Sequence, residues 1–378
     1  MKRIILTLVI LIFGIRNAYP SNKIEISLLT CSSGQESYEA WGHSAIRVIN
    51  FDNFTDLTYN FGLFDFSTPH FYLKFIQGKL KYQLGVHNTD VFIKSYVDEG
   101  RQVVEQKIDL SEENEKKIVD RLEYLYRPEN RFYYYNFVRK NCTTELRDLI
   151  FCNIHSDFKS QPINKSFRDF LSSYLKEQPW TDLGINLAMG SEIDKRINTY
   201  ESMFLPDILS RELNNVIIDG KNLVRDEIIY NENPRRSGHF PFFLTPVFIF
   251  SILALAILLS KSSTIQSIIF IIVGIAGLFL LLITLFTEHL ELKNNFNLLW
   301  CNPLYLVLAI LLLGNKWIKF QKFLSILLIL FIVSMAFIRL NHIQNFEYGF
   351  LPIIIVLLIS NLKILKKGAL YRFKERLQ

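Results

Sequence analysis

The balance of hydrophobic and polar residues changes twice along the chain. An apolar run, 4-IILTLVILIFGI-15, follows the basic start Met1-Lys2-Arg3, and a second apolar region begins near Phe240, with a stretch of mixed composition between them. A short apolar run behind basic residues is typical of an export signal or an uncleaved anchor. The pattern predicts five parts: a signal or anchor over 1–20, an exported domain over 21–232, a linker over 233–241, a membrane domain over 242–362 and a basic tail over 363–378.

Alternating runs in the mixed stretch predict strands, and a segment with a helical period follows them. In 44-SAIRVIN-50, Ile46 and Val48 fall on one face of a strand and Ala45 on the other. Ser111 can cap a helix over 111-SEENEKKIVDRLEYLY-126. Strands that precede helices in this way are typical of an α+β fold. The other runs that read as strands are 24–29, 57–66, 80–86 and 102–110.

Apolar segments after residue 241 predict an all-α membrane domain of about five transmembrane helices. The first two segments reach the roughly 20 residues that a span needs, and the third and fifth are short. Basic residues gather in 315-NKWIKFQK-322 and in the tail, whereas the loops 287–297 and 339–349 hold few. The positive-inside rule then places the tail in the cytoplasm and the exported domain in the periplasm of a bacterial inner membrane. The five segments are 242–260, 265–286, 303–314, 323–338 and 350–362.

Charge and composition exclude several classes of protein. The net charge is +6, but much of the excess lies in the tail, which favours contact with anionic lipid over nucleic acid. The spans hold almost no charged residue, which argues against a proton-coupled transporter. The sequence has no zinc-ligand spacing and no phosphate-binding glycine loop, so we expect neither metal nor cofactor. Cys31 and Cys152 would either form a disulfide in an oxidising compartment or stay as free thiols.

One histidine and one cysteine lie where the pattern allows nucleophilic chemistry. Asn141 predicts an N-cap, which puts Cys142 in the first turn of a helix, where the dipole and the backbone amides favour the thiolate. His43 follows Gly42 at the start of a predicted strand, so the sheet can hold its imidazole against that helix. The pair therefore predicts a nucleophile and its base. The alternative is that Cys142 is an inert buried thiol.

A third catalytic group and the substrate contacts are open at this point. Asn60 or Asp65 could orient the imidazole of His43, and we favour Asp65 because a charged acceptor raises the basicity of histidine. Arg139 would either contact a phosphate headgroup or be a solvated charge. Asn297 and Trp300 would either form a rim that holds a lipid-like substrate or be ordinary residues of the membrane interface.

The chain order of the pair resembles a known group of enzymes. A histidine strand before a cysteine helix reverses the order of papain and is similar to permuted papain-like enzymes of the NlpC type and of lecithin–retinol acyltransferase relatives, in which a GH strand precedes an NC helix. The sequence resembles the Lnb family of lipoprotein N-acyltransferases more closely, although Trp41 stands where phenylalanine is expected. The matching stretches are 30-TCSSGQESYEAWGHSAIRV-48, 59-YNFGLFDF-66, 133-YYYNFVRKNCTTELRDLI-150, 203-MFLPDIL-209 and 297-NLLWCNPL-304.

The resemblance implies acyl transfer within a membrane. Cys142 would take an acyl chain from a phospholipid as a thioester and pass it to the α-amine of the diacylglyceryl-cysteine of a lipoprotein. The implied partners are a phospholipid donor, diacylated lipoproteins and the membrane, with no cofactor. One alternative is a membrane-tethered cysteine hydrolase that cuts peptidoglycan peptides or phospholipid acyl esters. Another is a protein without enzymatic activity that binds lipid or protein.

Overall fold

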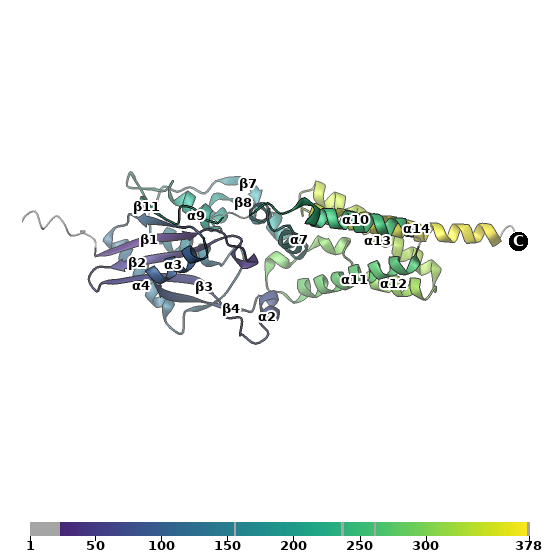
Figure 1. Cartoon of the computed structure of the whole chain (residues 1–378), viewed down its shortest axis with the longest axis horizontal. Coiled ribbons are helices and arrows are strands. Elements are labelled where there is room, and N and C mark those ends of the chain that lie inside the picture. Colours follow the sequence, from purple (N-terminus) through teal and green to yellow (C-terminus); the bar gives the residue numbers. More distant parts are fainter. Residues whose placement is uncertain (1–22, 155, 236–237, 261, 376–378) are drawn as a thin grey trace, which may run out of the picture.

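The computed structural model describes residues 23–154, 156–235, 238–260 and 262–375. The predicted signal over 1–20 and the end of the basic tail, 376–378, lie outside the described residues. The molecule is elongated, with a sheet-containing domain at one end and a bundle of apolar helices at the other (Figure 1). The predicted α+β layout of the N-terminal domain is confirmed.

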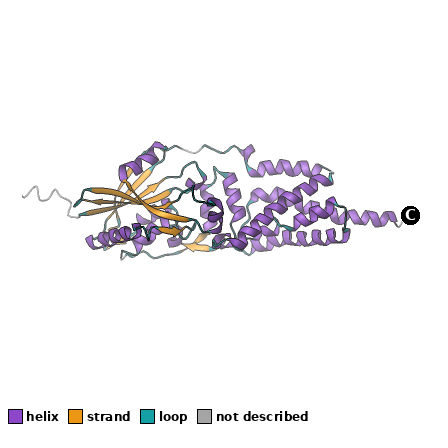
Figure 2. Cartoon of the chain, turned by 90° about the horizontal axis from the view of Figure 1, so that it is seen from below, coloured by secondary structure: helices purple, strands orange, loops and turns teal. Residues whose placement is uncertain are grey.

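An antiparallel sheet organises the N-terminal domain (Figure 2). Among the described residues it has seven strands in the order β11-β5-β1-β2-β3-β4-β6. Five of these strands match the predicted runs, but β3 ends at Leu63, three residues before the predicted end. Sequence reasoning missed β6 and β11, and β11 pairs with β5 from more than a hundred residues away. The strands are β1 (Ile24–Cys31), β2 (His43–Asn50), β3 (Thr55–Leu63), β4 (Lys81–Asn88), β5 (Val103–Ile108), β6 (Phe132–Tyr134) and β11 (Val224–Tyr230).

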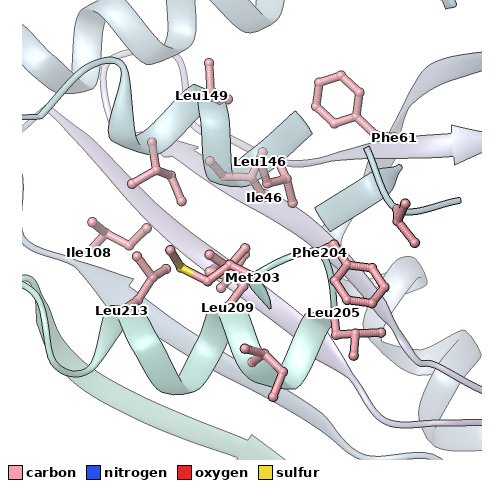
Figure 3. Close-up of a cluster of buried hydrophobic side chains, with 14 of the residues drawn as sticks. Ile46, Phe61, Ile108, Leu146, Leu149, Met203, Phe204, Leu205, Leu209 and Leu213 are labelled. Carbon is pink, nitrogen blue, oxygen red and sulfur yellow. The ribbon is translucent and has the colours of Figure 1, made fainter. Parts of the chain in front are cut away.

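Helices cover both faces of the sheet because its strands alternate apolar side chains. Ile46 of β2 belongs to the larger core, and Ala45 belongs to a smaller core on the opposite face. The larger core includes residues of α4 (Glu112–Tyr126), α5 (Cys142–Phe151) and α9 (Pro206–Leu213), and the smaller core includes residues of α3 (Thr89–Asp98). Figure 3 shows side chains of the larger core, with Leu146 of α5 and Leu209 of α9 directed toward the sheet. This packing fixes where α5 begins relative to β2.

Short elements complete the N-terminal domain. Two small two-stranded sheets lie outside the main sheet among the described residues. Ser111 caps α4 as predicted. The remaining helices are α2 (Phe71–Gln77), α6 (Phe167–Tyr174), α7 (Pro179–Ala188) and α8 (Thr199–Ser202), and the remaining strands are β7 (Pro162–Ser166), β8 (Arg196–Asn198), β9 (Ile217–Ile218) and β10 (Lys221–Asn222).

Four helical segments among the described residues are long and apolar enough to cross a membrane. They are α11 (Ser263–Phe286), the segment Leu290–Leu313, α13 (Ile318–Leu340) and the segment Tyr348–Lys366, most of which belongs to α14 (Leu351–Glu375). The second segment consists of two 3₁₀ turns and α12 (Leu304–Leu313). The first predicted span, 242–260, corresponds to α10 (Pro246–Leu259), which has only 14 residues. At ~1.5 Å per residue α10 is shorter than the hydrocarbon core, so a count of five spans stays a prediction.

The loop 287–297 binds the N-terminal domain closely. The side-chain amide of Asn295 donates to the carbonyl of Leu187 at 2.8 Å, and the Gly190 amide donates to the carbonyl of Glu291 at 2.7 Å. A β-carbon at Gly190 would come within 1.8 Å of the Lys293 carbonyl oxygen, so only glycine fits this contact. In the second loop, Asn345 donates its amide to Asp194 at 3.0 Å. Both loops that were predicted to share the side of the exported domain therefore contact it.

Candidate functional site

Asn141 fixes the start of α5 and so the position of Cys142. Its side-chain oxygen accepts the amides of Thr143 and Thr144 at 2.9 Å each, as expected of an N-cap. Its side-chain nitrogen donates to the carbonyls of Phe137 and Phe204 at 3.0 Å each. Cys142 is the first residue of α5, as predicted. The cap thus holds the thiol on a helix terminus that is itself anchored to two other segments.

Several groups act on the partly buried thiol of Cys142. Burial raises its pKa, but the charge of His43, a hydrogen bond with His43, the backbone amide of Ser44 and the hydroxyl of Thr143 together lower the pKa to about 7. The Cys142 Sγ lies 3.7 Å from the Thr143 Oγ1. A pKa near 7 gives a large thiolate fraction at neutral pH, which is the form that acts as a nucleophile.

His43 lies between Cys142 and Asn60. Its Nε2 is 2.6 Å from the side-chain oxygen of Asn60, which leaves Nδ1 for the sulfur of Cys142. Burial lowers the pKa of His43, but the charge of Cys142 and the hydrogen bonds with Cys142 and Asn60 outweigh burial and raise it. The two shifts agree: each group stabilises the charged form of the other, which favours a thiolate–imidazolium pair.

The structure places Asn60 rather than Asp65 beside His43, and this corrects the preference for Asp65. The carboxylate of Asp65 accepts the amide of Ser67 at 2.8 Å and its hydroxyl at 2.6 Å. These hydrogen bonds lower the pKa of Asp65, which lies in an exposed loop. Because β3 ends at Leu63, Asp65 lies beyond the strand that pairs with β2. Asn60 lies within that strand.

We expect Asn60→Ala to slow alkylation of the Cys142 thiol at pH 7 by about tenfold, because His43 loses the acceptor that orients it and raises its pKa. Asn60→Asp keeps an acceptor oxygen and should restore much of the rate. Asp65→Ala is the matched control and should stay within about twofold of the wild type. The measurement is the second-order rate of iodoacetamide labelling at Cys142, read by mass spectrometry. A larger effect of Asp65→Ala than of Asn60→Ala would reverse the assignment.

Gly62 keeps a small space open beside the pair. Its φ is +93°, a conformation that favours glycine. A β-carbon at this position would lie 3.5 Å from the Cβ of Cys142 and 4.0 Å from both the Cε1 of His43 and the hydroxyl oxygen of Tyr133. That hydroxyl is buried and has no hydrogen-bond partner among the described residues. The proton of the Tyr133 hydroxyl is therefore not used in a hydrogen bond within the described residues.

Asn297 and Trp300 are buried at the junction of the two domains, so the structure places them neither in a rim that holds a lipid-like substrate nor at the membrane interface. The side-chain amide of Asn297 donates to the carbonyl of Asn186 at 2.9 Å, and the indole of Trp300 donates to the Asn297 side-chain oxygen at 3.1 Å. Both residues are almost fully buried. They hold α7 against the membrane domain, which sequence patterns could not distinguish from contact with lipid.

Arg139 is paired with Glu291 rather than free. Its Nε lies 3.2 Å from Glu291 Oε1, and the side-chain amide of Asn136 donates to Glu291 Oε2 at 2.8 Å. Glu291 is fully buried, whereas Arg139 is half-exposed. The turn that begins at Asn136 leads into Asn141 and Cys142, so Glu291 connects the membrane domain to the nucleophile. Sequence reasoning missed Glu291; the available signal was an acidic residue in a loop between two apolar segments.

Cys31 lies beside His43 and is not joined to Cys152. It is the register partner of His43 in the pairing of β1 with β2. Burial raises its pKa above the ordinary value. Cys31, Cys142, Cys152 and Cys301 are all free thiols, so the disulfide alternative for Cys31 and Cys152 is not formed.

Comparison with known families matches most of the chain. A family model described as the Lnb N-terminal periplasmic domain matches residues 14–173, which include His43, Asn60 and Cys142. A second, described as the Lnb transmembrane domain, matches residues 238–368. No curated protein and no solved structure matches. The permuted papain-like relationship of the N-terminal domain therefore stays a prediction.

Proposed function

The chain belongs to the Lnb family, whose members join a periplasmic domain to a transmembrane domain, and on that premise we propose that it is a lipoprotein N-acyltransferase with Cys142 as its nucleophile. The observation that supports this most is the Cys142–His43–Asn60 arrangement at a helix terminus whose preceding turn contacts Glu291 of the membrane domain. We further propose the bacterial inner membrane as its location, with the N-terminal domain in the periplasm and the tail in the cytoplasm.

In the first step of the proposed reaction, the Cys142 thiolate attacks the carbonyl carbon of a phospholipid acyl ester. A carbon–sulfur bond forms and the ester carbon–oxygen bond breaks, so the acyl chain becomes a thioester and a lysophospholipid leaves. His43 gives its proton to the departing oxygen. The oxyanion needs hydrogen-bond donors, and two groups are suited to stabilise it. They are the Tyr133 hydroxyl and the Cys142 backbone amide, which has no acceptor among the described residues.

In the second step, the α-amine of a diacylglyceryl-cysteine attacks the carbonyl carbon of the thioester. A nitrogen–carbon bond forms, the carbon–sulfur bond breaks, and His43 takes the proton that the amine loses. Cys142 returns to the thiolate, which its pKa of about 7 makes a reasonable leaving group. The product is a lipoprotein with three acyl chains.

The membrane domain suits this reaction because both substrates are lipids. A soluble hydrolase needs at most one anchor, whereas here a domain with four apolar segments among the described residues is joined to the catalytic domain through Asn297 and Glu291. Contacts such as Glu291 with Arg139 hold the nucleophile at a constant height above the bilayer. A fixed height would present the thiol to an ester at the headgroup level of the leaflet.

The test uses the full chain in liposomes with an acyl-labelled phospholipid and a synthetic diacylglyceryl-cysteine peptide. We expect the peptide to gain the mass of one acyl chain at its amine, with one lysophospholipid formed for each acylated peptide. Formation of free fatty acid at the same rate with and without peptide, and no acylated peptide, would instead identify a phospholipid hydrolase. Absence of any lipid turnover, with cleavage of peptidoglycan peptides, would identify a wall hydrolase.

A further inference from the structure

An aromatic surface follows β3 and continues into α2. The rings of Phe64, Phe66 and Phe71 contact one another, with centroids 4.8–5.8 Å apart. Nevertheless Phe66, Tyr72 and Leu73 leave 57%, 73% and 55% of their surface exposed. All seven residues of α2 are described, and none of them is buried. Neighbouring exposed apolar side chains of this size mark an interaction surface rather than ordinary surface composition.

The end of a membrane span holds α2 in place. The segment α11 ends at Phe286, and the three residues that follow it each contact a backbone carbonyl at the C-terminal end of α2. These contacts are the Thr287 hydroxyl to the Ile76 carbonyl at 2.8 Å, the Glu288 amide to the Gln77 carbonyl at 3.0 Å, and the His289 Nε2 to the Phe75 carbonyl at 3.1 Å. Figure 1 shows α2 at the junction, next to the end of α11.

This attachment fixes the height of α2 relative to the bilayer. A seven-residue helix is only about 10 Å long, and the polar headgroup layer of one leaflet is roughly 5–8 Å thick. Because the carbonyls of α2 are bonded to residues directly after the span, its exposed side chains lie within the reach of that layer. Leu285 and Phe286, the last residues of the span, are exposed as well, so apolar side chains are exposed on both elements that meet at this attachment.

We propose that residues 64–77, here called the interfacial segment, insert their exposed aromatic and aliphatic side chains into the headgroup region of the leaflet that faces the N-terminal domain. The partner is the phospholipid surface itself. Lys74 within α2 supplies positive charge that suits anionic headgroups, whereas Lys79 is paired with Glu288 at 3.4 Å. This contact with lipid does not depend on the proposed acyl transfer.

Aromatic rings also connect the interfacial segment with the candidate site. Phe75 of α2 contacts Phe137 with centroids 5.4 Å apart, Phe137 contacts Tyr135 at 6.0 Å, and Tyr135 stacks on Tyr82 at 4.3 Å. Burial, and then the charge of Cys142, raise the pKa of Tyr135, which is consistent with a position close to the thiol. A phospholipid at the interfacial segment would therefore meet apolar rings between the leaflet and Cys142. This role, in which the interfacial segment guides a phospholipid toward Cys142, rests on the proposed function.

The first experiment measures immersion directly. A nitroxide spin label is placed at Leu73→Cys in a Cys142→Ala and Cys152→Ala background, and the full chain is reconstituted in phospholipid vesicles. The matched control is a label at Val91→Cys, a similarly exposed position on α3, the helix that packs on the sheet away from α2. We expect the ratio of oxygen collisions to collisions with a water-soluble nickel chelate to be several-fold higher at position 73. Equal ratios at the two positions would overturn the proposal, whatever the enzymatic activity is.

The second experiment tests the role in substrate delivery. Leu73→Asp adds a charge to the interfacial segment, and Val91→Asp adds the same charge on α3. We expect Leu73→Asp to raise the KM for bilayer phospholipid several-fold relative to a short-chain donor that is monomeric in water, and Val91→Asp to leave that ratio as in the wild type. An equal loss on both donors would show a folding defect and contradict the delivery role. If no donor is turned over by the wild type, the proposed function fails, while the spin-label result stands by itself.

Discussion

Cys142→Ala should remove N-acylation of lipoproteins below detection. Its thiol lies at a helix N-terminus with the imidazole of His43 as a hydrogen-bond partner, and loss of a nucleophile in comparable enzymes lowers turnover by roughly 10⁶-fold. The measurement is the intact mass of the N-terminal lipopeptide of a resident lipoprotein, in cells with the wild-type protein, with Cys142→Ala or with no protein. Wild-type cells should show one acyl chain more than the other two, at the α-amine.

Cys152→Ala is the matched control for the loss of a thiol. Cys152 lies at the opposite end of the same helix and is exposed, so its removal should leave the lipopeptide mass as in the wild type. Cys142→Ser serves as a second variant that keeps the size of the side chain, in case alanine disturbs the helix terminus. Full N-acylation of lipoproteins in cells with Cys142→Ser and in cells with Cys142→Ala, with both variants present at wild-type levels, would show that Cys142 is not the nucleophile.

The covalent intermediate gives an independent check on the same residue. With phospholipid present and no acceptor peptide, the wild-type chain should gain the mass of one acyl chain, and neutral hydroxylamine should release it because thioesters are labile to that reagent. Cys142→Ser would hold an ester instead, which resists neutral hydroxylamine. A label that survives hydroxylamine in the wild type would indicate that the acyl chain resides on another side chain.

The nucleophile could be predicted from the sequence because its position is set locally. The side chain of Asn141 caps α5 by accepting the amides of the residues two and three positions later, so neighbouring residues determine where the helix starts. The alternation of Ile46 and Val48 predicted the strand β2, and His43 was placed at its start, directly after Gly42. Short-range rules were enough to place each of these groups on its own element. The contact between the two elements was predicted from these placements, and the resemblance strengthened that prediction.

The predictions of the orienting group and of the substrate rim were wrong because both depend on contacts between segments that are distant in the sequence. The choice between Asn60 and Asp65 depends on where β3 stops, and the strand ends at Leu63, where its pairing with β4 also shifts register. Asn297 and Trp300 look like residues of a membrane interface, and only the docking of α7 shows that they are buried. The role of Glu291 could not be predicted either, since its side-chain partners Asn136 and Arg139 lie more than 150 residues away. Patterns within one segment contain no information on such partners.

His43→Ala should change both the reactivity and the pH profile of Cys142. In the wild type, the rate of iodoacetamide labelling at Cys142 should rise with pH through a midpoint at about 7, because the pKa of the thiol is lowered to that value. Burial is the largest single influence on this pKa and raises it. Without the imidazolium, burial is no longer outweighed, so the midpoint should move upward and labelling at pH 8 should slow by at least about tenfold.

The sign of this shift separates a catalytic pair from simple packing. Loss of a packing contact alone would make Cys142 more accessible and speed its labelling, whereas loss of the imidazolium makes the thiol harder to ionise and slows labelling. Cys152→Ala serves as the background for both proteins, because Cys152 is exposed and would otherwise be labelled. Acyl transfer should fall further than labelling, by about 10²–10⁴-fold, since the leaving oxygen also loses its proton donor. An unchanged midpoint in His43→Ala would show that another group ionises Cys142.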